Sequence, residues 1–119
     1  MTQKTVLLAL SLICAAAGPA AADFARVTEA EDFRRIIEGK TLTRPLIRLA
    51  VLPEGEIRGT GAAKTVSGSW QWQDGFFCRD LSWGDKALGY NCQEVRVNGQ
   101  KLRFTSDKGT GDSADFNLR

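Results

Sequence analysis

The fold is decided by residues 70–104, which read WQWQDGFFCRDLSWGDKALGYNCQEVRVNGQKLRF. This stretch holds all three tryptophans of the chain and two of its three cysteines. It also holds two dipeptides, Asp74-Gly75 and Asn98-Gly99, that favour two-residue hairpin loops because both loop residues accept positive φ. We therefore predict an antiparallel meander with an aromatic inner face and a disulfide on its outer face.

The Asp74-Gly75 loop sets the register of the first hairpin. It places Trp72 opposite Phe77 and Gln71 opposite Cys78. Directly opposed residues share a face, and successive residues alternate between faces. The predicted inner face therefore collects Trp70, Trp72, Phe77, Arg79 and Leu81, whereas Phe76 and Cys78 point outward.

An Asn98-Gly99 loop sets the register of a second hairpin. It places Val95 opposite Leu102 and Cys92 opposite Thr105. By the same alternation, Cys92 lies on a charged outer face. The predicted core residues of this hairpin are Val95, Val97, Leu102 and Phe104.

A third hairpin joins the other two, with Gly84-Asp85-Lys86 as its tip. Pairing Trp83 with Ala87 around this tip sets Cys78 directly opposite Cys92. Directly opposed residues supply the Cα separation of about 4.4–6.8 Å that a disulfide requires. We predict a Cys78–Cys92 disulfide that contributes about 3 kcal/mol to stability; the alternative is a pair of free structural thiols.

The start of the chain has the pattern of a secretory signal peptide. Lys4 gives a positive start, residues 6–13 are apolar, and Ala20-Ala21-Ala22 offers a cleavage site. The apolar run is too short to predict a membrane span. We therefore expect residues 1–22 to be removed, leaving residues 23–119 as a single periplasmic or secreted domain, where disulfides persist. A lipid anchor on Cys14 is an alternative, although Ile13 stands where that motif requires a small residue.

One short amphipathic helix is predicted over Glu29–Glu38. Thr28 and Glu31 have the spacing of a capping box, and Gly39 is suited to the position after the helix. The apolar stripe, formed by Ala30, Phe33, Ile36 and Ile37, is expected to cover one mouth or edge of the sheet. A helix that binds a partner is the alternative.

The remaining segments add short strands separated by turns. Residues 46–52 and 114–118 are apolar enough for strands, and residues 57–61 and 66–73 lead into the meander. Seven or eight strands after one helix predict a mainly β fold, a small antiparallel barrel or a strongly curved sheet. Gly59-Thr60-Gly61 and Gly109-Thr110-Gly111 lack the third glycine and the following helix of a nucleotide loop, so we interpret them as bends.

Composition argues against several functional classes. The chain has 16 basic and 14 acidic residues, a net charge of +2, and no histidine. Such a balance does not indicate nucleic-acid binding. The sequence offers no catalytic constellation, no metal site and no cofactor motif, so we expect a protein that is not an enzyme.

Six residues are candidate contacts for a ligand or partner. They are Trp70, Trp72, Phe76, Arg79, Trp83 and Tyr90. The inward aromatic side chains either form a core or line a ligand cup, whereas Phe76 and Trp83 have the placement of exposed binding hot spots. Arg79 is expected to pair with Asp80 or Asp85, to stack on Trp70, or to meet an anionic ligand.

The mature chain resembles known families at three motifs. Gly68-Ser69-Trp70, residues 72–79 and Cys92-Gln93 are similar to a group of small secreted alphaproteobacterial proteins. Some of these carry the name dihydrodipicolinate reductase, which would imply nucleotide-dependent reduction. Gly68-Ser69-Trp70 resembles the G-x-W of lipocalins, which implies a carrier barrel. Ser67-Gly68-Ser69-Trp70 is similar to the Ser-Gly-x-Tyr loop of periplasmic inhibitors of C-type lysozyme.

Three functional hypotheses follow. The first is non-enzymatic binding of a protein or cell-envelope component through Phe76 and Trp83. The second is a lipocalin-like carrier of a small apolar or anionic ligand near Trp70, Trp72 and Arg79, which requires an internal cavity. The third is the reductase activity that the name of some similar proteins implies.

Overall fold

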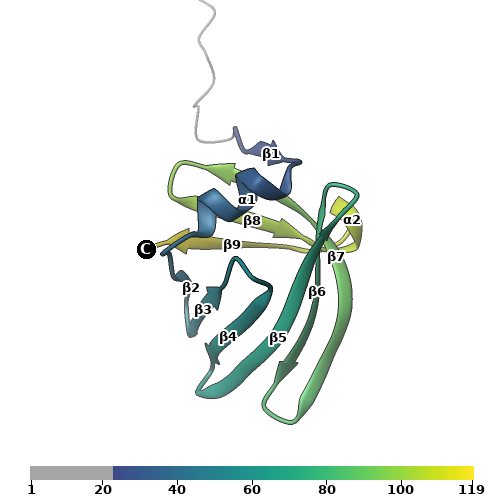
Figure 1. Cartoon of the computed structure of the whole chain (residues 1–119). Coiled ribbons are helices and arrows are strands. Elements are labelled where there is room, and N and C mark those ends of the chain that lie inside the picture. Colours follow the sequence, from purple (N-terminus) through teal and green to yellow (C-terminus); the bar gives the residue numbers. More distant parts are fainter. Residues whose placement is uncertain (1–22) are drawn as a thin grey trace, which may run out of the picture.

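The structure, a computed structural model, describes residues 23–119. The predicted signal peptide, residues 1–22, and with it Cys14, the alternative site of a lipid anchor, lie outside the described residues. The described chain is mainly β, as predicted: eight antiparallel strands close into a barrel, accompanied by two helices and one disulfide (Figure 1).

The elements follow one another along the chain in a simple order. They are β1 (Ala25–Val27), α1 (Ala30–Ile37), β2 (Leu42–Arg44), β3 (Ile47–Val51), β4 (Glu56–Gly61), β5 (Lys64–Gln73), β6 (Phe76–Trp83), β7 (Lys86–Asn98), β8 (Lys101–Thr105), α2 (Ser106–Gly109) and β9 (Ser113–Leu118).

The long strand β7 closes the barrel. The sheet order is β1-β7-β6-β5-β4-β3-β2-β9-β8, and β8 returns to pair with β7. Residues 86–93 of β7 pair with β6, and residues 94–98 pair with β8. The short strand β1, which the sequence did not predict, pairs with residues 95–97.

Two glycines allow neighbouring strands to approach closely. A Cβ atom at Gly59 would collide with the carbonyl oxygen of Arg48, and one at Gly68 would collide with that of Asp80. Gly59-Thr60-Gly61 lies inside strand β4 and pairs without a register shift with β3 and β5, so the predicted bend at this triplet is not formed. The second triplet, residues 109–111, lies at the connection between α2 and β9.

The predicted register of the first hairpin is confirmed. Gln73 pairs with Phe76, Trp72 with Phe77, and Trp70 with Arg79. Asp74 and Gly75 have φ values of 52° and 84°, the pair of positive angles that a type I′ loop requires.

The predicted register of the second hairpin is wrong by two residues. Asn98 pairs with Lys101 and Val95 with Phe104, so the loop consists of Gly99 and Gln100. Only Gly99 has positive φ, at 56°, as expected when glycine occupies the first position of a type II′ loop. A shift of two residues keeps every side chain on its predicted face, so Val95, Leu102 and Phe104 are buried as expected.

The third hairpin also differs from the prediction near its tip. Trp83 pairs with Lys86, so the loop has two residues, Gly84 and Asp85. The extra residue is Leu88, which lies in a β-bulge where the register shifts between Leu81 and Ser82. The bulge restores the predicted pairing further along, where Cys78 opposes Cys92.

The predicted Cys78–Cys92 disulfide is present. Cys78 lies between Phe77 and Arg79, which both line the interior, so its side chain points outward as predicted. Cys78 is nevertheless only 2% exposed. A short side chain bonded to its neighbour on the same face leaves little surface for solvent.

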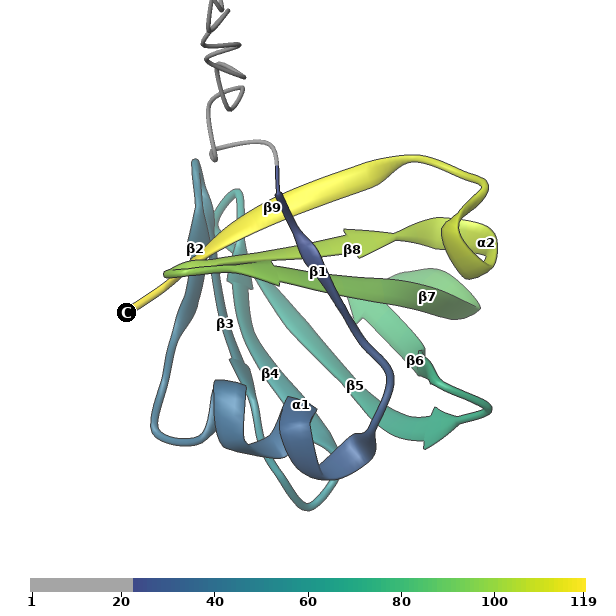
Figure 2. The same ribbon diagram turned by 90° about the horizontal axis from the view of Figure 1, so that it is seen from above.

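Helix α1 covers one end of the barrel. Figure 1 shows it across the upper end, away from the turns that follow β2, β4 and β6, and Figure 2 shows the same arrangement from above. Phe33 is fully buried, and its ring lies 5.1 Å from that of Trp70 and 5.2 Å from that of Phe77. The predicted position across one mouth is therefore confirmed.

The predicted start of the helix is wrong by one residue. The N-cap is Glu29 rather than Thr28, and it forms no side-chain cap bond. Thr28 directly follows β1, and its carbonyl oxygen accepts a hydrogen bond from the indole nitrogen of Trp72 at 3.0 Å. These contacts hold Thr28 in the extended segment that precedes the helix. At the other end, Gly39 adopts positive φ, at 68°, as predicted.

Candidate functional site

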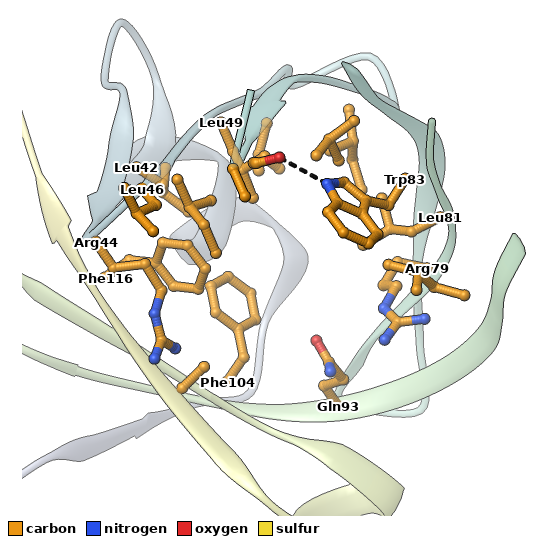
Figure 3. A pocket seen from close by; sticks show the side chains of 18 of the residues that line it. Leu42, Arg44, Leu46, Leu49, Arg79, Leu81, Trp83, Gln93, Phe104 and Phe116 are labelled. Carbon is orange, nitrogen blue, oxygen red and sulfur yellow. Dashed lines mark hydrogen bonds between the residues drawn. The ribbon is translucent and has the colours of Figure 1, made fainter. Parts of the chain in front are cut away.

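The barrel encloses a cavity that opens at the end opposite α1. Its volume is about 570 Å³. Three turns surround the opening: the β2–β3 turn at residues 45–46, the β4–β5 turn at residues 62–63, and the β6–β7 turn at residues 84–85. Most of the lining is apolar, including Leu42, Ile47, Leu49, Leu81, Phe104 and Phe116 (Figure 3).

The floor of the cavity belongs to the same aromatic cluster that holds α1. Phe77 and Phe104 line the cavity, and their ring centroids lie 5.1 Å apart. Phe33 packs against both from the other side. The cavity therefore has a firm base built by residues from β6, β8 and α1.

Trp83 lies at the opening and faces the interior. Its indole nitrogen donates a hydrogen bond of 2.6 Å to the carbonyl oxygen of Gly61 (Figure 3). The ammonium group of Lys64 lies 4.3 Å from its ring centroid. The hydrogen bond joins β6, which carries Trp83, to β4, which carries Gly61. It therefore holds the ring in place as part of the cavity wall.

Arg79 is the charged group that faces the cavity from β6. Its Nη1 donates a hydrogen bond of 2.7 Å to the carbonyl oxygen of Gly89. Burial lowers the pKa of the guanidinium, and the nearby charge of Asp80 only partly offsets this. Among residues 23–119 no carboxylate forms an ion pair with Arg79, so the predicted pairs with Asp80 and Asp85 are not formed.

Two other polar side chains border the cavity. Gln93 on β7 pairs with Phe77 and is therefore a diagonal neighbour of Arg79. Arg44 lies on the other side, with its guanidinium carbon 5.6 Å from the ring centroid of Phe116 (Figure 3). Neither residue was among the predicted contacts, although strand alternation places Gln93 on the inner face.

The structure separates the six candidate residues predicted from sequence. Arg79 and Trp83 line the cavity. Trp70 is buried in the core, where its indole nitrogen donates to the carbonyl oxygen of Leu52 and Arg34, rather than Arg79, lies over its ring. Trp72 stacks on Phe33 of α1, at the closed end of the barrel.

The last two candidates lie on the outer surface. Phe76 is half-buried beneath two cations, with Arg26 and Lys108 at 4.8 and 5.6 Å from its ring centroid. Tyr90 is 61% exposed and donates a long hydrogen bond to Gln73. Neither residue lines the cavity.

Within residues 23–119 no group of three or more histidine, cysteine, aspartate or glutamate side chains is arranged to hold a metal ion. The helices of this part of the chain are too short or too polar to cross a membrane. No protein-family model, curated protein or solved structure matches the chain.

Proposed function

We propose that this domain binds a small ligand with an apolar body and an anionic head group, and carries it inside the barrel. The main support is the guanidinium of Arg79, which faces an apolar cavity and has no carboxylate partner among the described residues. Arg79 is half-buried, and the nearby charge of Asp80 offsets only part of the cost of that burial. A partly desolvated charge without an ion-pair partner is unfavourable, and an anionic ligand would lower that cost.

The apolar lining favours a hydrocarbon body. A volume of about 570 Å³ lies within the range of about 300–1,000 Å³ that is typical of small-molecule sites. Each methylene group moved from water into such a lining contributes about 0.8 kcal/mol. The rings of Phe77 and Phe104 form an apolar base for the ligand.

The head group is best matched by a carboxylate. Arg79 uses one of its N–H groups on Gly89, which leaves other donors of its planar fork for two parallel hydrogen bonds. The amide nitrogen of Gln93, on the adjacent strand, donates one hydrogen bond of 3.2 Å to Ser106 Oγ, and its second N–H is a further donor close to the same place. A fatty acid therefore combines both features of the cavity.

The surroundings of the aromatic side chains favour this carrier hypothesis over binding of a protein through Phe76 and Trp83. Phe76 is covered by Arg26 and Lys108, and Trp83 is turned toward the cavity. We also propose that the domain acts outside the cytoplasm, since its start has the pattern of a signal peptide and its disulfide is consistent with an oxidising compartment.

Calorimetric titration of residues 23–119 with decanoate and with the uncharged analogue decanol tests the proposal. We expect both compounds to bind, and decanoate to bind more tightly. The variant Arg79→Met should weaken decanoate binding by about tenfold or more, because a charge-assisted hydrogen bond is lost, while decanol binding is retained.

The matched control is Arg58→Met, which removes an exposed guanidinium from the outer face of β4. It should leave both affinities unchanged. Arg79→Met should remain folded because methionine replaces an unpaired charge in an apolar wall. If neither compound binds, or if Arg79→Met affects both compounds equally, the proposed function is wrong.

A further inference from the structure

The opening of the cavity has a surface unlike the rest of the barrel. Leu46 and Leu88 are two of the three large apolar side chains that the described chain exposes, at 80% and 46%. Both border the cavity. Leu46 forms the tip of the β2–β3 turn, and the bulge in β7 places Leu88 beside the β6–β7 turn.

The exposed Leu46 also has an unfavourable backbone conformation. With Pro45 before it and a φ of 68°, Leu46 occupies the position of a type II turn that normally requires glycine or asparagine. Its carbonyl oxygen accepts a hydrogen bond of 2.8 Å from the backbone N–H of Ala62, which ties two of the three turns together. The turn therefore holds an unfavourable, exposed leucine in a fixed position, a feature that points to a functional role.

The two ends of the barrel carry net charges of opposite sign. Around the opening, residues 44–48, 61–65 and 83–88 contain four cations, Arg44, Arg48, Lys64 and Lys86, and one carboxylate, Asp85. None of these cations forms an ion pair within residues 23–119. At the closed end, residues 26–40, 52–56 and 74–75 contain seven carboxylates, three guanidinium groups and one ammonium group.

We propose that the opening docks on an anionic lipid bilayer. Leu46 and Leu88 enter the interface between head groups and acyl chains, and the surrounding cations attract the anionic head groups. The acidic closed end is repelled by the same surface, so the domain binds with its cavity facing the membrane. This inference deepens the proposed function, on which it rests: an apolar ligand passes between bilayer and cavity without crossing water.

Co-sedimentation of residues 23–119 with vesicles tests the docking surface. We expect binding to vesicles of equal parts phosphatidylglycerol and phosphatidylcholine that weakens as salt is raised, and much weaker binding to pure phosphatidylcholine. Leu46→Asn should lower partition by about tenfold, because one leucine no longer enters the interface. Its thermal midpoint should not fall, since asparagine tolerates positive φ.

A pair of double variants separates position from net charge. Arg48→Gln/Lys86→Gln, at the opening, should lower partition by about tenfold or more. Lys40→Gln/Lys101→Gln removes two exposed cations remote from the opening and should leave partition unchanged. The proposed docking surface is refuted if the wild-type chain does not bind anionic vesicles. It is also refuted if the two double variants reduce vesicle binding by the same factor.

Two further outcomes decide between occupants and between proposals. Self-association of the wild-type chain that Leu46→Asn abolishes, without vesicle binding, would replace the bilayer with a second copy of the chain. If the chain binds decanoate in buffer but does not bind vesicles, the membrane-docking proposal is refuted and the proposal that the cavity holds a ligand stands. Vesicle binding that depends on the opening, without decanoate binding, would support docking and refute the carrier.

Discussion

The alanines of the β4–β5 turn show how single residues depart from sequence expectation. Ala62 and Ala63 form a two-residue loop between Gly61 and Lys64, with φ values of 46° and 67°. Two positive φ angles define a type I′ loop, for which Asn-Gly is favoured. Alanine carries no such signal, so this turn could not be recognised from the sequence, whereas Asp74-Gly75 could.

Replacing the loop by its favoured dipeptide should stabilise the protein. We expect Ala62→Asn/Ala63→Gly to raise the free energy of unfolding in urea by about 1 kcal/mol, because left-handed backbone is unfavourable for alanine. The control Ala87→Gly lies in β7, has no positive φ, and should lower stability. An unchanged or lower stability of the double variant would contradict the left-handed assignment.

A cross-strand ion pair makes stability depend on pH. Arg103 donates two hydrogen bonds to Asp115, of 2.7 and 3.0 Å, and these hold the pKa of Asp115 below its ordinary value of 3.8. The carboxylate form is thus favoured in the folded state. The pair's contribution is present above the unfolded pKa and is lost as pH falls through the lowered folded pKa.

The variant Asp115→Asn tests this dependence. Both side chains are about one third exposed, so the loss of stability at neutral pH should be small. The difference between wild type and variant should shrink below pH 3.8, measured by urea unfolding at several pH values. A difference that stays constant from neutral to acidic pH would assign the loss to packing instead.

At the scale of the hairpin, a register error of an even number of residues does not change which face of the sheet a side chain occupies. The Asn98-Gly99 signal predicts a register two residues from the observed one, yet it identifies the core residues because side chains on a strand repeat every two residues. In the third hairpin the extra residue was assigned to the tip, but it lies in the bulge at Leu88. Propensities do not fix such details, which depend on how each strand fits its neighbours.

The disulfide is the element-scale contact with the largest expected effect. Cys78 and Cys92 are 14 residues apart. Closing a loop of this size should contribute about 3 kcal/mol through the unfolded chain. We therefore expect Cys78→Ala/Cys92→Ala to lower the free energy of unfolding in urea by about that amount. A similar loss should follow when the wild-type chain is reduced, and a loss in the variant alone would indicate a packing defect.

At the scale of the whole molecule, the fold class was predictable and the cavity was not. Strand alternation identified the inner face, and the amphipathic stripe of α1 indicated that it would cover one mouth. Whether the interior is packed or hollow depends on how β2, β8 and β9 close the ring, which involves contacts distant in sequence. The sequence therefore left Arg79 with several alternatives, and the closed barrel places it beside an apolar space.

The two ends of the barrel differ both in charge and in access to the cavity. Phe33 seals the acidic end, whereas the basic end is open and bordered by Leu46 and Leu88. Net charge alone, at +2, conceals this division. A carrier that exchanges its ligand with a membrane requires such an arrangement, because the ligand must leave and enter through the end that faces the bilayer.

The most direct test of the carrier function is nuclear Overhauser spectroscopy of residues 23–119 with isotope-labelled decanoate. We expect contacts between the methylene groups of decanoate and Leu49, Leu81 and Trp83, with the carboxylate end nearest Arg79. Decanoate that contacts only outer residues such as Tyr90, or that contacts no residue at all, would contradict the assignment of the barrel interior as a ligand site.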